Sequence, residues 1–184
     1  AEPFLTKEGW IEPHPTIPGC QRCQWKPKSS TLVTIMIPFK DQSECTHACI
    51  ESIRRHAGSI RYEIILINNN SVEQETDDWL ATLNNDQDIT VLEIKSEFNF
   101  AALNNAARRH AHGDFLLLLN NDIEFRSANT LTELLAPFAF KATGAVGRRL
   151  LYPDGSVQHQ GAVIIRGERR ALLEPGKGIA GISV

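Results

Sequence analysis

The stretch FNFAALNNAARRHAHGDFLLLLNND, residues 98–122, joins a helical segment, a strand and a polar strand end in direct succession. Residues 100–111 have helical composition, and residues 114–119 form an apolar run of strand length. We predict that this run is the most buried strand of the fold. Three polar residues, 120–122, end it, so this stretch contributes one helix, one strand and one polar loop.

The same alternation extends back along the chain. Short β-branched or apolar runs are typical of buried strands, and the longer segments between them have helical composition. The predicted strands cover residues 31–37, 62–67, 89–94 and 114–119, and the helices between them begin near residues 41, 73 and 100. An order β-α-β-α-β-α-β predicts the α/β class, with a mostly parallel sheet, helices on both faces and right-handed crossovers.

Local signals fix the ends of some elements. Asp41 and Glu44 have the spacing of a capping box, so we expect them to begin the first helix, which Gly58 closes. After the fourth strand, residues 131–138 look helical, and residues 144–165 read as two short strands around a Pro-Asp-Gly turn.

The chain divides into three parts by pattern. Residues 1–30 are Pro-rich and show no periodicity, so we expect a leader or linker there. Residues 31–165 carry the α/β pattern and form one domain. Residues 166–184 are a weakly patterned tail.

Composition excludes several classes of protein. The chain has 184 residues, of which 42% are hydrophobic and 22% charged, with a net charge of -3. Basic residues are not in excess, so the composition does not favour nucleic acid as a partner. No apolar run approaches the ~20 residues that span a bilayer, and the N-terminus lacks the features of a signal peptide. We expect a cytoplasmic protein without a transmembrane segment, at most peripheral at the inner face of the membrane.

The four cysteines, Cys20, Cys23, Cys45 and Cys49, leave two interpretations open. Their spacing is compatible with a zinc site. The better interpretation is that Cys45 and Cys49 lie on the apolar stripe of the first helix and behave as small hydrophobic residues, while the other two are incidental thiols.

Polar residues follow three of the predicted strands, in PFKD, NNNS and NND. Ligands of open α/β sheets bind beyond the carboxyl ends of the strands, so these ends favour a site. The chain lacks the Gly-rich motifs of Walker loops and of dinucleotide folds. A divalent cation on a carboxylate is the remaining way to hold a diphosphate, and Asp122 follows the apolar strand.

Four segments in this order, VTIMIPFKDQ, EIILINNNS, FNFAALNNAARRHAHGDFLLLLNNDIE and GAVGRRLLYPDGSVQHQGAVI, resemble the successive motifs of glycosyltransferase family 2. The likeness covers about residues 31–165 and is nearest to the rhamnosyl-type branch of O-antigen and capsule sugar transferases. It implies the GT-A fold, a Rossmann-like α/β fold.

The resemblance assigns roles residue by residue. Asn68 matches the residue that reads the pyrimidine edge, and Asp122 matches the last position of the metal-binding D-x-D, where Mn²⁺ or Mg²⁺ is expected. Glu124, two residues on, is expected on the same strand face. The donor-binding positions as a whole are Pro38, Phe39, Asp41, Asn68, Asn70, Asn99, Asn105, Asn120 and Asn121.

The resemblance also implies a reaction. It is inverting transfer from a UDP-, dTDP- or GDP-linked sugar to a hydroxyl of a saccharide or lipid-linked acceptor, in polysaccharide or glycan synthesis. The general base of the family has no match, although Glu168 and Glu174 lie in the tail, so the acceptor half is expected to be truncated. Two interpretations of His159, in the VQHQG motif, stay open: it faces the sugar site, or, as the better interpretation, it is a structural histidine of the last hairpin.

Two rivals follow from the same residues. Asn68 and Asn120 stand where the family has acids, which favours a non-catalytic nucleotide-sugar-binding or interaction module derived from such an enzyme. A nucleotidyltransferase needs a basic, Gly-rich loop after the first strand, and PFKDQSE is neither.

Overall fold

A computed structural model describes residues 4–159, 162–163 and 171–172. The chain divides into two compact units. One unit comprises Ala1–Lys26 with Glu133–Val184, and the other is Pro27–Thr132. The parallel sheet and all the polar strand ends belong to the second unit.

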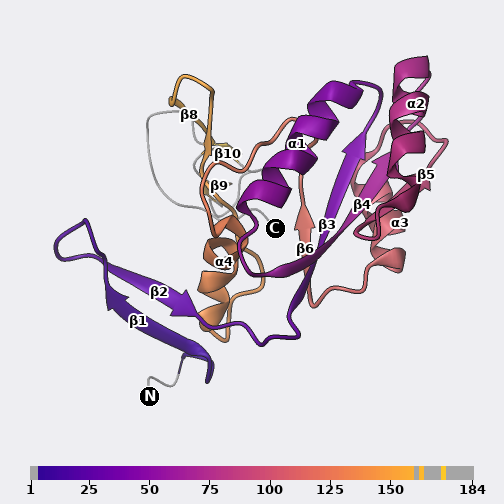
Figure 1. Cartoon of the computed structure of the whole chain (residues 1–184). Helices are drawn as coiled ribbons and strands as arrows, with labels where there is room; N and C mark the ends of the chain where they lie inside the picture. Colours follow the sequence, from indigo (N-terminus) through magenta and orange to yellow (C-terminus); the bar gives the residue numbers. More distant parts are fainter. Residues whose placement is uncertain (1–3, 160–161, 164–170, 173–184) are drawn as a thin grey trace. The chain divides into compact units, whose positions relative to one another are not determined.

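The sheet of this unit has the strand order β5-β4-β3-β6, and all its pairings are parallel (Figure 1). Its strands are β3 (Leu32–Phe39), β4 (Arg61–Asn68), β5 (Ile89–Glu93) and β6 (Phe115–Leu118). Each of the four predicted strands is present, and no end differs by more than two residues from the prediction. The predicted α/β class and parallel sheet are confirmed.

The prediction that residues 114–119 form the most buried strand is wrong. In the described part of the chain β6 pairs with β3 alone, and Leu116 and Leu118 are 39% and 49% exposed. β3 and β4, each with a neighbour on both sides, carry the fully buried side chains instead. An apolar run shows that a strand is apolar, but strand order decides how much of it is covered.

Helices cover both faces of the sheet, as predicted. Leu103 and Ala107 pack with Met36, Ile65 and Ile67 on one face. Successive strand residues point to opposite faces, so Phe39 faces the other side from Met36, and there it meets Trp79 edge-on at 6.0 Å. The helices are α1 (Ser43–His56), α2 (Gln74–Thr82) with η1 (Leu83–Asn85), and α3 (Phe100–Ala107) with η2 (Arg108–His110).

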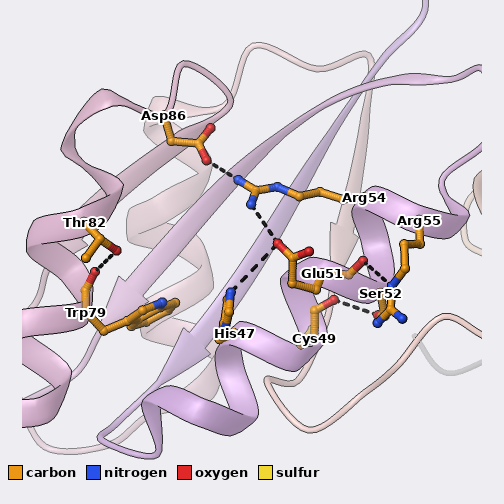
Figure 2. Close-up of polar contacts among 9 residues, drawn as sticks. All are labelled: His47, Cys49, Glu51, Ser52, Arg54, Arg55, Trp79, Thr82 and Asp86. Atoms are coloured by element: carbon orange, nitrogen blue, oxygen red, sulfur yellow. Dashed lines mark hydrogen bonds and ion pairs between the residues drawn. The ribbon is translucent and has the colours of Figure 1, made fainter.

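Polar contacts tie α1 to the segment that contains α2 (Figure 2). Arg54 pairs with Glu51 at 2.8 Å and also with Asp86, just after η1. The rings of His47 and Trp79 lie 6.3 Å apart. These contacts hold both helices on the same side of the sheet.

The first helix begins differently from the prediction. Its N-cap is Gln42, which has φ of 53° and caps no N–H with its side chain. The Asp41 carboxylate accepts hydrogen bonds from the backbone N–H groups of Val72 and Glu73 instead. The prediction of a capping box formed by Asp41 and Glu44 is therefore wrong, because the Asp41 carboxylate binds the loop after β4.

Regular structure also occurs where none was expected, near the N-terminus. Strands β1 (Gly9–Pro13) and β2 (Gln21–Trp25) form an antiparallel hairpin. The carboxylate of Glu12 accepts hydrogen bonds from Arg22, its partner across the ladder, from Gln24 and from Trp10. These cross-strand pairs stabilise a hairpin that shows no hydrophobic alternation.

The remaining described elements are α4 (Thr130–Leu135), η3 (Ala136–Ala139), β7 (Leu150–Leu151), β8 (Val157–His159), β9 (Ala162–Val163) and β10 (Ala171–Leu172). The predicted Pro-Asp-Gly turn joins β7 and β8, with Gly155 at φ of 86°. His159 lies in this hairpin, opposite Leu150. Glu168 and Glu174 lie outside the described residues. Nowhere in the described ranges is a helix both long and apolar enough for a membrane crossing.

Candidate functional site

A hollow of about 240 Å³ lies where the strands of the sheet end. The segments that follow β3, β4, β5 and β6 all contribute to it, as expected for ligand sites of open α/β sheets. Small-molecule sites have volumes of roughly 300–1,000 Å³, so this hollow accommodates part of a nucleotide sugar. Its lining consists of Pro38, Phe39, Lys40, Asn69, Phe98, Phe100, Asn120, Asn121 and Asp122.

The structure brings together five of the predicted site residues. Pro38 and Phe39 come from the end of β3, and Asn120, Asn121 and Asp122 follow β6. Sequence reasoning missed Lys40, Asn69, Phe98 and Phe100. Each of them is adjacent in sequence to a predicted site residue: Lys40 to Phe39, Asn69 to Asn68, and the two phenylalanines to Asn99. This adjacency is the signal that could have identified them.

The side chain of Asn68 contacts neighbouring segments of the chain. It is buried and lies outside the described lining of the hollow. Its amide nitrogen donates to Glu93 at 2.9 Å, and its amide oxygen accepts from the backbone N–H of Ser71 at 3.2 Å. Both ends of the side chain therefore hold neighbouring segments in place.

The next two amides fix the segment that follows β5. Asn69 donates to the backbone carbonyls of Ile94 and Ser96, at 2.9 and 3.0 Å. Asn70, at φ of 60°, donates to the same Ser96 carbonyl at 2.6 Å. Of these amides, Asn69 is the one that also lines the hollow.

Asp41 joins the loops after β3 and β4. Its backbone N–H donates to the Ser71 hydroxyl at 2.7 Å, while its carboxylate accepts from Val72 and Glu73. These two backbone hydrogen bonds hold the pKa of the Asp41 carboxyl below its ordinary value. A positive φ at a non-glycine residue costs about 1–3 kcal/mol, and these contacts sustain it at Asp41.

Two predicted residues lie on α3. Asn99 is its N-cap, and its side chain accepts from the backbone N–H of Ala102 at 3.0 Å. Asn105 is exposed on the helix, outside the described lining. Its neighbour Asn104 is buried instead and donates to the carbonyl of Phe100, while its own amide oxygen has no partner among the residues that the structure describes.

One face of α1 positions the segment that contains Asp122. The thiols of Cys45 and Cys49 donate to the carbonyls of Asn121 and Asn120, at 3.5 and 3.8 Å. On the same helix the hydroxyl of Ser52 accepts from the backbone N–H of Phe125. The polar loop after β6 is therefore held by Ser52 and by the two cysteines that were expected to act as small hydrophobic residues.

The charges of this loop act on the thiols. Burial raises the pKa of Cys45, and the nearby carboxylates of Asp122 and Glu124 raise it further. The pKa of Cys49 is raised to about 12, mainly by burial. Both thiols therefore keep the proton that they donate. Glu124 does not extend a strand face, because β6 ends at Leu118.

Asp122 supplies the carboxylate of the hollow. Within the ranges that the structure describes, no three His, Cys, Asp or Glu side chains gather as a metal site. Magnesium in proteins is often bound by one or two carboxylates together with substrate phosphates. Asp122 is an exposed carboxylate beside open space, and two amides precede it in the chain. Such a carboxylate is suited to a metal ion that a phosphate of the ligand also coordinates.

Comparisons with known proteins identify the family of the chain. The sequence profile described as Glycosyl transferase family 2 matches residues 34–178, and so continues past Ile165, where the quoted motifs stop. The chain is 36% identical over 149 residues to the uncharacterized protein y4gI of Sinorhizobium fredii, covering 80% of this chain and 16% of that protein. It is 33% identical over 147 residues to the O-antigen biosynthesis protein RfbC of Myxococcus xanthus, covering 78% and 11%.

The fold has a counterpart among solved structures. A mannosyltransferase of Pyrobaculum calidifontis, in complex with GDP-Man and Mn²⁺, superposes with a TM-score of 0.53 over 70% of this chain and 39% of that one, at 19% identity. The chain spans less than a fifth of the curated relatives named above. From the matching profile, the chain belongs to glycosyl transferase family 2.

Proposed function

We propose that residues 31–165 bind a nucleotide-diphosphate sugar together with a divalent metal, Mn²⁺ or Mg²⁺, for transfer of the sugar to a hydroxyl acceptor. The observation that carries the proposal is the hollow at the strand ends, where Asp122 lies among Asn120, Asn121 and the Pro38–Phe39 segment. Membership of the family and the likeness to a mannosyltransferase fold support it.

The charges of the hollow suit a diphosphate. Asp122 would hold the metal, and a bound divalent metal neutralises the charge that develops on the leaving diphosphate. Lys40 lines the same hollow and adds a cationic side chain. Asn120 and Asn121 add amide groups that accept or donate hydrogen bonds without charge.

The contacts of the asparagines after β4 bear on which of them reads the base. Both ends of the Asn68 side chain are bonded, to Glu93 and Ser71. The amide nitrogen of Asn69 is bonded too, to Ile94 and Ser96, but Asn69 lines the hollow and its amide oxygen accepts no hydrogen bond from the described residues. We assign the contact with the base edge to Asn69, with Asn68, Asn70, Asn99 and Asp41 holding the surrounding loops. Asn105 has no assigned contact.

The finer parts of the function are proposals as well. They are inversion at the anomeric carbon, a saccharide or lipid-linked acceptor in polysaccharide synthesis, and location in the cytoplasm or at the inner face of the membrane. The O-antigen biosynthesis protein among the relatives supports the polysaccharide assignment.

Calorimetric titration tests the proposal. UDP, dTDP and GDP are titrated into the chain with Mn²⁺ and, separately, with EDTA. We expect one or more of them to bind, and to bind more tightly with Mn²⁺. Absence of binding by all three in both conditions would contradict the proposal.

A second candidate is a binding module that performs no transfer. The observation that favours it is that the described lining of the hollow contains one carboxylate, Asp122, with asparagines beside it. Incubation with UDP-, GDP- and dTDP-sugars, acceptors and Mn²⁺ separates the two. Released nucleotide with glycosylated product indicates a transferase, and tight binding without release indicates the module.

A further inference from the structure

Two aromatic side chains line the hollow on the side of β5. Phe98 is 72% exposed and Phe100 is 39% exposed. Single exposed apolar residues are common on proteins, but these two flank one residue and border the same hollow. Exposed rings at the rim of a ligand site provide a surface on which a flat ring can stack.

The segment that carries these rings is fixed at both ends. Asn69 and Asn70 both donate to the carbonyl of Ser96, two residues before Phe98. Asn99, between the two rings, caps α3 through the backbone N–H of Ala102. The rings are therefore carried by an anchored segment, so little backbone conformational entropy is lost when a ligand packs on them.

The order of the strands gives the hollow two unlike ends. β5 and β6 lie at opposite edges of the described sheet, about 14 Å apart for three strand spacings. The aromatic rings follow β5, and Asp122 follows β6. Lys40 and Asn69, from the two central strands, line the space between them.

We propose that Phe98, with Phe100 beside it, is the stacking surface for the base of the nucleoside diphosphate. This inference rests on the proposed function and assigns the direction of the ligand. A nucleoside diphosphate has an aromatic ring at one end and two phosphates at the other. Its phosphates lie toward Asp122 and Lys40, and its base lies on the rings after β5.

Stacking on a phenyl ring is tolerant of the base, because every base has a π face. Phe98 therefore strengthens binding of purine and pyrimidine nucleotides alike, while the choice between them lies with the amide of Asn69. The two roles are separable by experiment.

The test compares the parent chain with Phe98→Ala, Phe98→Leu and Phe98→Tyr by calorimetry with UDP, GDP and inorganic pyrophosphate, each with Mn²⁺. We expect Phe98→Ala to bind UDP and GDP about 5- to 150-fold more weakly. Phe98→Leu, which is apolar but not aromatic, recovers little of this loss, and Phe98→Tyr recovers most of it. Pyrophosphate, which has no base, binds all four proteins equally.

Phe4→Ala is the matched control, because Phe4 is 71% exposed and belongs to the other unit. It leaves all three affinities unchanged. Unchanged binding of UDP and GDP by Phe98→Ala overturns the inference and leaves the proposed function standing, as does an equal loss of pyrophosphate binding, which indicates a distorted site. If the parent chain binds no nucleotide, the proposed function itself fails.

Discussion

The side-chain amide of Asn121 donates a hydrogen bond to the hydroxyl of Thr46 at 3.1 Å, joining the polar loop after β6 to the buried face of α1. Thr46 is fully buried, and its hydroxyl also donates to the carbonyl of Gln42 in the turn that follows β3. One hydroxyl thus connects the loops at the ends of β3 and β6. Asp122 is the next residue in the loop, so we expect this connection to contribute to its position.

Substitution Thr46→Val keeps the shape of the side chain and removes both hydrogen bonds. We expect the free energy of unfolding to fall by about 0.5–1.5 kcal/mol per lost bond, measured by urea denaturation. We also expect a severalfold weaker affinity for UDP with Mn²⁺, since the loop is less well positioned. Thr90→Val, at an exposed position of β5, is the control. Unchanged affinity in Thr46→Val would mean that the loop keeps its geometry without α1.

Asp122→Asn tests the metal assignment. The parent chain at a nucleoside diphosphate concentration 100 times Kd gains about 2.7 kcal/mol of stability from the ligand. In the variant we expect the part of this gain that requires Mn²⁺ to disappear, as seen by thermal denaturation with Mn²⁺ and with EDTA. Glu124→Gln, an exposed carboxylate outside the described lining, serves as the control and retains the gain. A full Mn²⁺ effect in Asp122→Asn would remove Asp122 from the metal site.

Asp41 provides a test of how the loops are held. The same oxygen accepts from the backbone N–H groups of Val72 and Glu73, at 2.7 and 3.0 Å. Asp41→Asn retains a carbonyl oxygen there, whereas Asp41→Ala retains none. We expect hydrogen exchange at the amides of Val72 and Glu73 to accelerate in the alanine variant and to stay slow in the asparagine variant. Equal protection in both would show that backbone contacts alone fix this loop.

Glu63 gives the protein a dependence of stability on pH. Burial raises its pKa, but hydrogen bonds from Thr34 and from the backbone and ring of His112 outweigh burial and leave the pKa below its ordinary value of 4.5. A carboxyl with a lowered folded-state pKa stabilises the fold above its unfolded-state pKa. That contribution is lost as the pH falls through the lower, folded-state pKa.

The measurement is urea unfolding of Glu63→Gln and of the parent between pH 7 and pH 3. We expect the variant to be less stable at pH 7 and to lose less stability than the parent on acidification below about pH 4.5. Glu97→Gln, at an exposed loop position, follows the parent curve. A variant whose curve runs parallel to that of the parent down to pH 3 would contradict this role of Glu63.

Local sequence patterns determined the elements of the sheet unit. Apolar runs with β-branched residues gave β3 and β4 to within two residues, because buried strands of a parallel sheet are apolar on both faces. The alternation of strands and helices gave the parallel topology, because a parallel pair requires a crossover. The loops at the strand ends were identified from the predicted topology, because the carboxyl ends of parallel strands lie at a common edge of the sheet.

Tertiary structure alone decided which side chains of those loops face the hollow. Residues 68–70 are all asparagine, and their side chains bind neighbouring segments. Of the three, Asn69 is the one in the described lining of the hollow. Strand order likewise decided that the apolar run of β6 lies at an edge of the described sheet. Both outcomes depend on contacts between residues far apart in the chain, such as that of Asn121 with Thr46. Local sequence patterns do not predict such contacts.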